Sequence, residues 1–590
     1  MIKNLLILSR EKEMALVSWK DTYQTWLNET SLELSLKNEL QDMATNETKL
    51  EDAFYAPLSF GTAGMRGLLG PGINRMNIYT VRQATEGLAR FMDTLDESVK
   101  TRGVAISFDS RHHSQDFAHE AAHVLGAHGI KSFVFEGLRP TPELSFTVRH
   151  LHTYAGIMIT ASHNPKEYNG YKIYGEDGGQ MPPKESDLIT SYVRKVSDLF
   201  NIQVADETQL MNDHTMKIIG DDVDQAYLAK VKTVTINPKL AQEVGKDMKL
   251  VFTPLHGTGQ MLGEKALQNA GFTNYEIVPE QAQPDPDFST VTKPNPEDPA
   301  AFTLAIELGK KVNADVLVAV DPDADRLGTA VRQPNGEYQL LTGNQIASVL
   351  LHYILEAHKQ AGDLPVNAAV VKSIVSTEFA TKIAQSYNVA MINVLTGFKY
   401  IAQKIEQFEA TGEHSYMFGF EESYGYLIKP FVHDKDAIQS LVLLAEVAAY
   451  YRSQGKTLYD GLQELFQEYG YFREKTISQT YAGIDGADQI KALMKKFREE
   501  APTHFAGHAI VATEDFSTQT KTTSDGKIVK IDLPVANVLK YLLDDETWIA
   551  IRPSGTEPKL KFYIGTNAES LELANQKLAD FETALNEFIA

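Results

Sequence analysis

The chain has 590 residues, of which 43% are hydrophobic and 23% charged, the composition of an ordinary globular protein with no sign of disorder. Its formal net charge of −22 argues against nucleic-acid binding, because phosphate backbones demand clustered Lys and Arg. The absence of cysteine excludes disulfides and thiol catalysis. No stretch approaches the roughly 20 apolar residues of a membrane helix, and the apolar run at residues 4–8 is too short for an export signal. We expect a cytoplasmic protein of about four domains, at roughly 150 residues per domain.

Apolar, β-branched runs alternate along the chain with helical patterns, and each run ends in a polar loop. The runs predict strands at 104–108, 155–159, 250–253, 316–320, 368–371, 415–418 and 547–551. This alternation is typical of α/β domains, in which the loops at the carboxyl ends of the strands carry the chemistry.

A candidate nucleophile follows the run at 155–159. Ser162 lies in Thr160-Ala161-Ser162-His163-Asn164-Pro165, where a serine at a strand end would be exposed and held in place. Taken alone, the segment is more often a turn than a nucleophile, because Asn and Pro favour turns. Gly-x-Ser-x-Gly is absent around Ser162, which disfavours a serine hydrolase.

The next polar loop, after the run at 250–253, contains Gly257, Gly259 and Gly263. A glycine-rich turn between a strand and a helix can bind a dinucleotide, which would make the protein an oxidoreductase. The spacing here is Gly-x-Gly-x-x-x-Gly, so the indication is weak.

Three carboxylates alternate after the run at 316–320. Asp321, Asp323 and Asp325 offer hard oxygen ligands for Mg²⁺ and would leave positions open for phosphate oxygens. A calcium-binding EF-hand loop is excluded, because Arg326 replaces its glycine and Arg332 its bidentate glutamate. A solvated acidic loop remains an alternative for this segment alone.

Two further segments complete the pattern. Gly419-Phe420-Glu421-Glu422-Ser423-Tyr424-Gly425 places carboxylates and a hydroxyl after a strand, which suits sugar hydroxyls. Arg552-Pro553-Ser554-Gly555-Thr556-Glu557-Pro558 could enclose a phosphate with a guanidinium and two hydroxyls. The second segment lacks the lysine of a nucleotide-binding P-loop, and alone it could be an ordinary turn.

The four segments, in this order, resemble the phosphoserine, metal, sugar-binding and phosphate-binding loops of the α-D-phosphohexomutases, the family of phosphoglucomutase and phosphomannomutase. The resemblance spans about Leu58 to Ile564. The segments at 60–67 and 420–426 look most like the bacterial phosphoglucomutases related to the phosphopentomutase branch. The family's fold implies three related α/β domains with mixed sheets and a smaller C-terminal α+β domain around a central cleft. The domains expected on this basis are 1–208 (phosphoserine loop), 209–331 (metal), 332–454 (sugar) and 455–590 (phosphate).

The resemblance also implies roles for individual residues. Phosphorylated Ser162 would donate its phosphoryl group to a sugar monophosphate, and the resulting bisphosphate would turn over and return its other phosphoryl group. Mg²⁺ would be held by Ser162, Asp321, Asp323 and Asp325. The expected catalytic residues are Ser162, His163, Lys172, Lys399 and Arg66, with orientation of the loop an equal alternative for His163. The expected substrate-binding residues are Arg326, Thr396, Gly397, Glu421, Ser423, Arg552, Ser554, Gly555 and Thr556.

The activity implied is interconversion of glucose 1-phosphate and glucose 6-phosphate, with Mg²⁺ as cofactor and glucose 1,6-bisphosphate as intermediate and activator. By resemblance, the adjacent Glu421 and Glu422 favour glucose over mannose. A phosphopentomutase or phosphomannomutase with the same mechanism stays open, as does a silent sugar-phosphate-binding protein. The expected partners are sugar phosphates, and neither monomer nor dimer is excluded.

Overall fold

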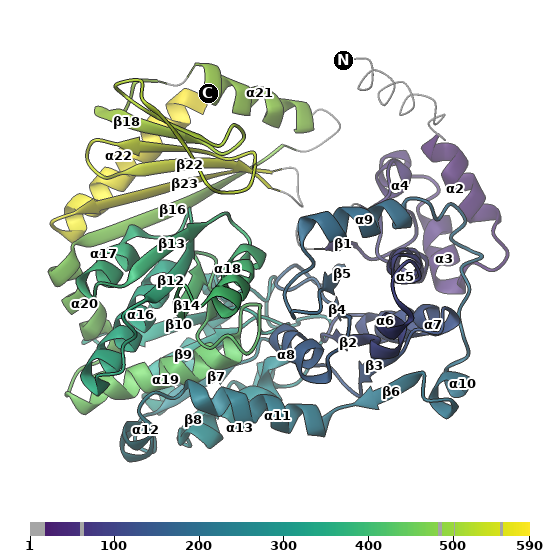
Figure 1. The fold of residues 1–590 in the computed structure, drawn as a ribbon, viewed down its shortest axis with the longest axis horizontal. Helices are drawn as coiled ribbons and strands as arrows, with labels where there is room; N and C mark the ends of the chain where they lie inside the picture. The colour runs from purple at the N-terminus through teal and green to yellow at the C-terminus, as the bar shows by residue number, and fades with distance from the viewer. Residues whose placement is uncertain (1–17, 59–63, 482–485, 501, 555–558, 590) are drawn as a thin grey trace.

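The computed structural model describes residues 18–58, 64–481, 486–500, 502–554 and 559–589 (Figure 1). The segments 59–63 and 555–558, which carry parts of two of the motifs, lie outside the described residues. Three α/β units with mixed sheets and a C-terminal α+β unit follow one another along the chain. The fold class expected from the sequence is confirmed.

The first unit has a six-stranded sheet in the order β1-β5-β4-β2-β3-β6, in which β4, β2, β3 and β6 are parallel. Helices α5 and α7 pack on one face and α8 on the other. The strands are β1 (Met65–Leu68), β2 (Val104–Phe108), β3 (Ser132–Phe135), β4 (Ala155–Ile159), β5 (Tyr168–Tyr174) and β6 (Met216–Ile219). The helices are α5 (Ile78–Met92), α6 (Glu97–Arg102), α7 (Ser114–Ala127), α8 (Thr141–Leu151), α9 (Pro183–Val193) and α10 (Glu207–Asn212).

Among the residues described before this sheet, the helices are α2 (Trp19–Asn28), α3 (Leu34–Asp42) and α4 (Glu47–Phe54). Trp26 packs edge-on against both Phe54 and Tyr79, at centroid distances of 5.8 and 5.6 Å. Because Tyr79 belongs to α5, this aromatic cluster joins the N-terminal helices to the first unit.

The second sheet has the order β11-β10-β9-β7-β8 and the third the order β13-β12-β14-β15. Their strands are β7 (Leu250–Thr253), β8 (Tyr275–Ile277), β9 (Val316–Val320), β10 (Leu327–Arg332), β11 (Tyr338–Leu340), β12 (Ala368–Ser373), β13 (Ala390–Val394), β14 (Ser415–Glu421) and β15 (Gly425–Leu427). Their helices are α11 (Asp221–Val231), η1 (Lys232–Val234), α12 (Pro238–Val244), α13 (Gly259–Ala270), α14 (Pro279–Ala282), η2 (Pro299–Phe302), α15 (Thr303–Val312), α16 (Gly343–Ala361), α17 (Glu378–Ser386), α18 (Phe398–Thr411), α19 (Ala437–Ser453) and α20 (Leu458–Tyr469).

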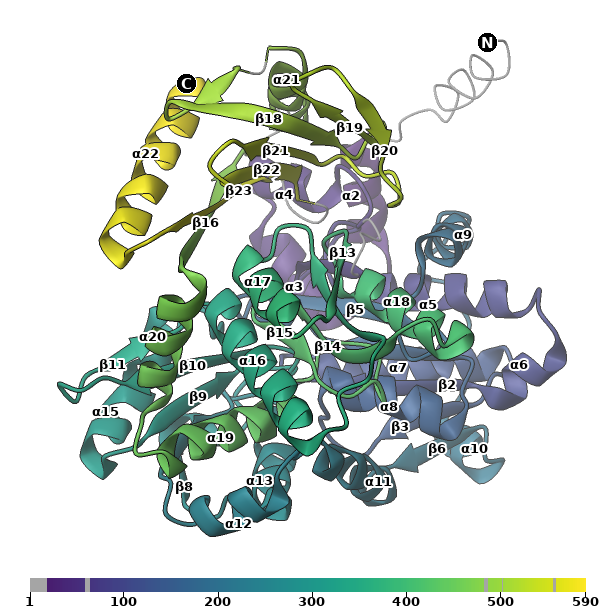
Figure 2. The ribbon, with the colours of Figure 1, turned by 60° about the vertical axis from the view of Figure 1, so that its left-hand side comes forward.

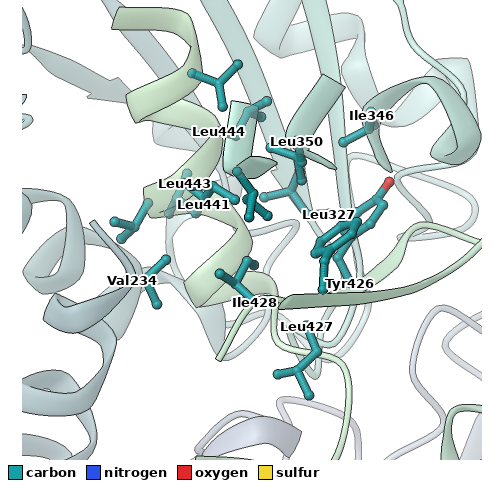
Figure 3. Close-up of a cluster of buried hydrophobic side chains, with 14 of the residues drawn as sticks. Val234, Leu327, Ile346, Leu350, Tyr426, Leu427, Ile428, Leu441, Leu443 and Leu444 are labelled. Carbon is teal, nitrogen blue, oxygen red and sulfur yellow. The ribbon is translucent and has the colours of Figure 1, made fainter. Parts of the chain in front are cut away.

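The second and third units share one core, built around α19. This helix is apolar almost all round, as expected for a helix with no solvent face. Figure 3 shows its leucines Leu441, Leu443 and Leu444 among side chains from β10, β15 and α16. The shared core fixes the loops of the two sheets relative to each other.

The C-terminal sheet has the order β16-β23-β22-β21-β18-β19-β20, and β17 pairs with β18. Its helices α21 and α22 cover one face, and the other lies over the third unit, as Figure 2 shows. The elements are β16 (Tyr471–Thr480), α21 (Gly486–Glu499), β17 (His504–Phe505), β18 (His508–Asp515), β19 (Thr520–Thr523), β20 (Ile528–Lys530), β21 (Leu539–Leu543), β22 (Trp548–Pro553), β23 (Lys559–Ala568) and α22 (Leu571–Ile589).

Strand pairing extends two sheets past the domain boundaries expected at 208/209 and 331/332. The strand β6 adds to the first sheet beside β3, and β11 adds to the second beside β10. The helix α20, after the boundary expected at 454/455, packs in the shared core through Leu462 and Phe466. Within the described residues, no helix is long and apolar enough to cross a membrane.

Candidate active site

Ser162 stands at the carboxyl end of β4 in a constrained backbone conformation. Its φ of 52° lies in the left-handed region, which non-glycine residues seldom adopt and which often marks functional sites. The Thr160 hydroxyl accepts a hydrogen bond from the Ser162 amide at 2.8 Å. The Ser162 hydroxyl donates to Oδ2 of Asp321 at 2.7 Å, across two units of the fold. The predicted nucleophile and the predicted metal loop are therefore in direct contact.

Arg111 holds the loop of Ser162 in place through hydrogen bonds, a role that the sequence reasoning missed. Its guanidinium donates to the backbone carbonyls of Ser162, Asn164, Pro165 and Tyr168. The charge of this fully buried group is balanced by Asp109, at 3.2 Å. The only local signal was an arginine two residues after Asp109, at the end of a buried strand.

We expect Arg111→Lys to lower kcat by about 100-fold with little change in KM, because a lysine cannot contact four carbonyls at once and small misplacements of reacting atoms cost about that much. Steady-state kinetics on variants with matched circular dichroism spectra would measure the split. A kcat within twofold of the parent would contradict the positioning role.

The three aspartates of the metal loop follow β9 and converge on one point. One carboxylate oxygen of each lies within 4.8 Å of the others, and all three side chains are buried. Asp321 Oδ1 also accepts the backbone amides of Asp325 and Arg326, at 3.1 and 2.9 Å, which closes the loop. The loop docks on the first unit, where the Thr141 hydroxyl donates to Oδ2 of Asp323 at 2.9 Å.

The electrostatics of this loop favour a bound cation. Burial and the neighbouring Asp323 and Asp325 raise the pKa of Asp321 well above its ordinary value. Burial alone would raise the pKa of Asp323 too, but the Lys172 ammonium, 2.9 Å away, lowers it. Lys172, Lys435 and Arg326 lie beside these carboxylates, yet the pKa of Asp321 stays raised, and a cation bound among the three oxygens would relieve their mutual repulsion.

These residues fit Mg²⁺. The oxygens Asp323 Oδ1 and Asp325 Oδ1 are buried and have no hydrogen-bond partner among the described residues. Burying carboxylate oxygens in this way destabilises the fold unless a cation binds them. The donor set is all oxygen, as Mg²⁺ prefers, and the Ser162 hydroxyl adjoins it. Asp321, Asp323, Asp325 and Ser162 are thus the residues that would hold the ion.

His163 adjoins the Ser162 hydroxyl, and Arg66 contacts the same loop. The ring Nδ1 of His163 lies 3.1 Å from Oγ of Ser162. Burial, reinforced by the positive charges of Arg326 and Arg66, lowers the pKa of His163 well below its ordinary value, so the imidazole is neutral at pH 7. Arg66 donates to the side-chain oxygen of Asn164 at 2.7 Å, which ties it to the serine loop. Both residues are therefore held at the loop of the predicted nucleophile.

The sugar-binding segment meets a second predicted loop. Glu421, at the end of β14, accepts a hydrogen bond from the backbone amide of Gly397 at 2.7 Å. This contact places Thr396 and Lys399 beside Glu421 and Ser423, and all four residues line one cavity. Burial raises the pKa of Glu421 and lowers that of Lys399.

Lys435 is a further charged group that the sequence reasoning missed. It bridges Asp325 of the metal loop, at 3.0 Å, and Asp434, at 3.1 Å. Burial opposes its charge, but the carboxylates of Asp325 and Asp434 raise its pKa above the ordinary value. The residue follows no predicted strand, so only tertiary structure brings it to the site.

The C-terminal unit supplies a cluster of cationic side chains to the same site. Arg552, at the end of β22, donates to the Tyr563 hydroxyl at 3.1 Å, and its buried Nε has no hydrogen-bond partner among the described residues. Lys561 pairs in register with Arg552 across β22 and β23, which the sequence reasoning missed. Ser554 lies beside them, whereas the predicted phosphate ligands Gly555 and Thr556 lie outside the described residues.

We expect Lys561→Met to raise KM for a sugar phosphate about tenfold with kcat nearly unchanged, because a charged hydrogen bond to phosphate contributes about 1.5 kcal/mol. Lys475→Met is the matched control, since Lys475 lies on β16 and pairs with Glu582 at 2.6 Å, outside the cavity lining. Equal KM values for the two variants would contradict a phosphate-binding role for Lys561.

A cavity of about 440 Å³ joins these segments. Most predicted site residues line it, whereas Asp321 and Asp323 lie beneath its wall. The lining comprises Arg66, Ser162, His163, Lys172, Gln180, Asn295, Glu297, Asp325, Arg326, Thr396, Gly397, Phe398, Lys399, Glu421, Glu422, Ser423, Lys435, Thr476, Ser478, Arg552, Ser554, Lys561 and Tyr563.

The glycine-rich segment considered for a dinucleotide serves close packing instead. A Cβ on Gly257 would lie 2.2 Å from Cα of Pro322, and one on Gly259 would lie 2.6 Å from the side chain of Val320. The Thr258 amide donates to the carbonyl of Pro322 at 2.7 Å. The turn therefore supports the metal loop and leaves no room there for a pyrophosphate.

Comparisons with known proteins agree with this geometry. Models of the phosphoglucomutase/phosphomannomutase family match the chain as alpha/beta/alpha domains I, II and III and the C-terminal domain, at residues 57–199, 225–336, 342–469 and 488–580. The phosphoglucomutase of Staphylococcus epidermidis is 40% identical over 544 residues, 92% of this chain and 97% of its own. That of Staphylococcus aureus is 39% identical over 536 residues, 90% of this chain and 94% of its own. The open form of parafusin, a phosphoglucomutase of Paramecium, shares the fold with a TM-score of 0.65 at 17% identity, covering 90% of this chain and 95% of its own. The chain therefore belongs to the phosphoglucomutase/phosphomannomutase family and is an enzyme of the isomerase class, an intramolecular phosphotransferase.

Proposed function

We propose that this enzyme interconverts glucose 1-phosphate and glucose 6-phosphate through a phosphorylated Ser162 and a glucose 1,6-bisphosphate intermediate. The observation that carries the proposal is the 2.7 Å contact of the Ser162 hydroxyl with Asp321, at the edge of a cavity that also holds acids and cations for a sugar phosphate. Curated relatives that share about 40% of their residues with this chain are named phosphoglucomutase, which favours glucose as the sugar.

In the first step, the free hydroxyl of a bound sugar monophosphate attacks the phosphorus of phosphoserine 162. The new P–O bond forms to the sugar as the bond to Ser162 Oγ breaks, and the hydroxyl proton passes to a base. Lys399 lines the cavity as the candidate base, because burial lowers its pKa toward the range a base requires. Lys172, paired with Asp323 as an ammonium, is the candidate acid.

In the second step, the bisphosphate turns over and returns its other phosphoryl group to Ser162. Neutral His163, with Nδ1 3.1 Å from Oγ of Ser162, can hold the serine proton or orient the loop. Glu421 and Ser423 bind the sugar hydroxyls, while Arg552, Lys561 and Ser554 bind the phosphate that does not react. An anchor of this kind suits a sugar that must bind in two orientations.

Asp321, Asp323 and Asp325, with Ser162, are proposed to hold Mg²⁺. Bound there, Mg²⁺ would offset the negative charge of the phosphoryl oxygens, as in other phosphoryl transfers. Arg66 and Arg326 add positive charge from the cavity wall. A cytoplasmic location stays a prediction.

The test is conversion of glucose 1-phosphate with Mg²⁺ and a trace of glucose 1,6-bisphosphate, run beside mannose 1-phosphate and ribose 1-phosphate. We expect the fastest turnover with glucose 1-phosphate and none in the presence of EDTA. Faster turnover of ribose or mannose phosphate would show that the substrate is not glucose 1-phosphate, while the proposed mechanism would still hold. No turnover of any of the three would contradict the proposed activity.

A further inference from the structure

A second group of metal-ligand side chains lies away from the cavity, where α10 packs on α7 (Figure 1). One potential ligand atom from each of His119, His123 and Glu207 lies within 4.8 Å of the other two. Oε2 of Glu207 is 3.1 Å from Nδ1 of His119 and 2.9 Å from Nε2 of His123. None of the three residues lines the cavity of the candidate active site.

These separations suit a tetrahedral metal. With bonds of about 2.0 to 2.1 Å to nitrogen and oxygen, neighbouring ligands of a tetrahedral Zn²⁺ lie roughly 3.3 Å apart. His119 and His123 are four residues apart on α7, so both rings project from one face of the helix. The two imidazole nitrogens lie within 4.8 Å of each other, so a metal could be reached by adjustment of these three side chains alone.

The site is built in advance by contacts that involve no metal. The Ala205 amide donates to the carbonyl of His123 at 3.0 Å, just before α10 begins. Leu210 of α10 lies directly over Gly126, where a Cβ would come within 2.5 Å of its side chain. These contacts hold Glu207 opposite the two rings.

A second carboxylate supports His123 on its far side. Oε2 of Glu120 lies 3.7 Å from Nδ1 of His123, and its Oε1 accepts from Nε of Arg82 at 2.6 Å. Metal-bound histidines almost always face such a carboxylate or carbonyl through their other nitrogen, which orients the ring. Arg82 also balances the extra negative charge.

The sequence His119-Glu120-Ala121-Ala122-His123 has the spacing of the zinc peptidases, in which the glutamate activates water on the metal. Here Glu120 is held by Arg82 and faces the outer nitrogen of His123, so it is not available as that base. The site therefore has three protein ligands and one position left for water, and Glu120 is not placed to activate that water.

We propose that His119, His123 and Glu207 bind a transition-metal dication, with Zn²⁺ the expected ion, and that the metal fastens α10 to α7. Two imidazoles and one carboxylate suit Zn²⁺, whereas Mg²⁺ and Ca²⁺ prefer oxygen ligands. Mg²⁺ bound at the aspartate loop would therefore not compete for this site.

The test is equilibrium dialysis of the chelator-stripped full chain against Zn²⁺ in excess Mg²⁺, with metal content read by mass spectrometry. We expect one Zn²⁺ per chain, lost in the double variant His119→Ala/His123→Ala. Glu120→Gln should weaken binding about 10- to 100-fold, as for the loss of a carboxylate that orients a ligand. His508→Ala is the matched control, because the cluster of His508 with Asp544 and Asp545 already contains Lys577, 2.8 Å from Asp545.

Equal zinc content in the parent and the double variant would overturn the proposal, as would a parent that retains no Zn²⁺. Loss of the Zn²⁺ in Asp323→Asn but not in the double variant would place the ion at the active site instead. The fastening is tested by hydrogen exchange: Zn²⁺ should slow exchange across residues 205–212 in the parent and not in the double variant. Unchanged exchange in zinc-loaded parent would contradict it.

Discussion

Replacing Ser162 with alanine should abolish turnover while leaving the fold intact. The side chain supplies the only atom that the proposed mechanism phosphorylates, and removal of such a nucleophile typically costs about 10⁴-fold or more in kcat. The backbone at φ 52° is no worse for alanine than for serine, and the lost hydrogen bond to Asp321 contributes about 1 kcal/mol. The measurements are kcat for glucose 1-phosphate and the intact mass after incubation with glucose 1,6-bisphosphate.

The matched control is Ser423→Ala, which removes a hydroxyl from another loop that lines the same cavity. This variant should still gain the mass of one phosphoryl group, with a raised KM. Ser162→Ala should gain none. Retention of phosphoryl incorporation or near-normal turnover by Ser162→Ala would refute the phosphoserine assignment and move the nucleophile elsewhere.

The sequence was enough to predict the parts of the site that follow buried strands. Ser162 follows β4, the three aspartates follow β9 and Glu421 ends β14, so a local pattern locates each of them. Short apolar runs that end in polar residues indicate such positions without reference to any partner. The same reasoning predicted the mixed α/β sheets, because helical and strand periods alternate along the chain.

Residues whose function depends on distant partners could not be predicted in this way. Arg111 acts on carbonyls about fifty residues further along the chain, and Lys435 reaches Asp325 from a loop with no strand before it. In the sequence, Lys561 is one charged residue among several in its strand, and only the pairing of β22 with β23 places it beside Arg552. The limits of the sheets escaped prediction for the same reason, since β6 and β11 are assigned by pairing and not by local pattern.

Asp323→Asn should weaken Mg²⁺ binding and activity together, each by roughly 100-fold or more, because the loss of a group that only orients a metal ligand already costs about 10- to 100-fold. The change preserves shape and leaves an oxygen to accept from Thr141, but it removes one of three buried negative charges. It also removes the closest carboxylate partner of Lys172, whose other one is Asp325 at 3.7 Å. The measurement is a Mg²⁺ titration of activity, with melting temperatures recorded with and without the ion.

Mg²⁺ should raise the melting temperature of the parent, because a ligand that binds only the folded state stabilises it, and the shift should disappear in Asp323→Asn. Asp287→Asn is the control: Asp287 is exposed and contacts Lys166 of the serine loop at 3.1 Å, but no metal-loop carboxylate. Its Mg²⁺ titration should match that of the parent. If the titration of Asp323→Asn also superimposed on the parent's, Asp323 would not be a ligand, and the unpartnered Oδ1 of this buried carboxylate would need another explanation.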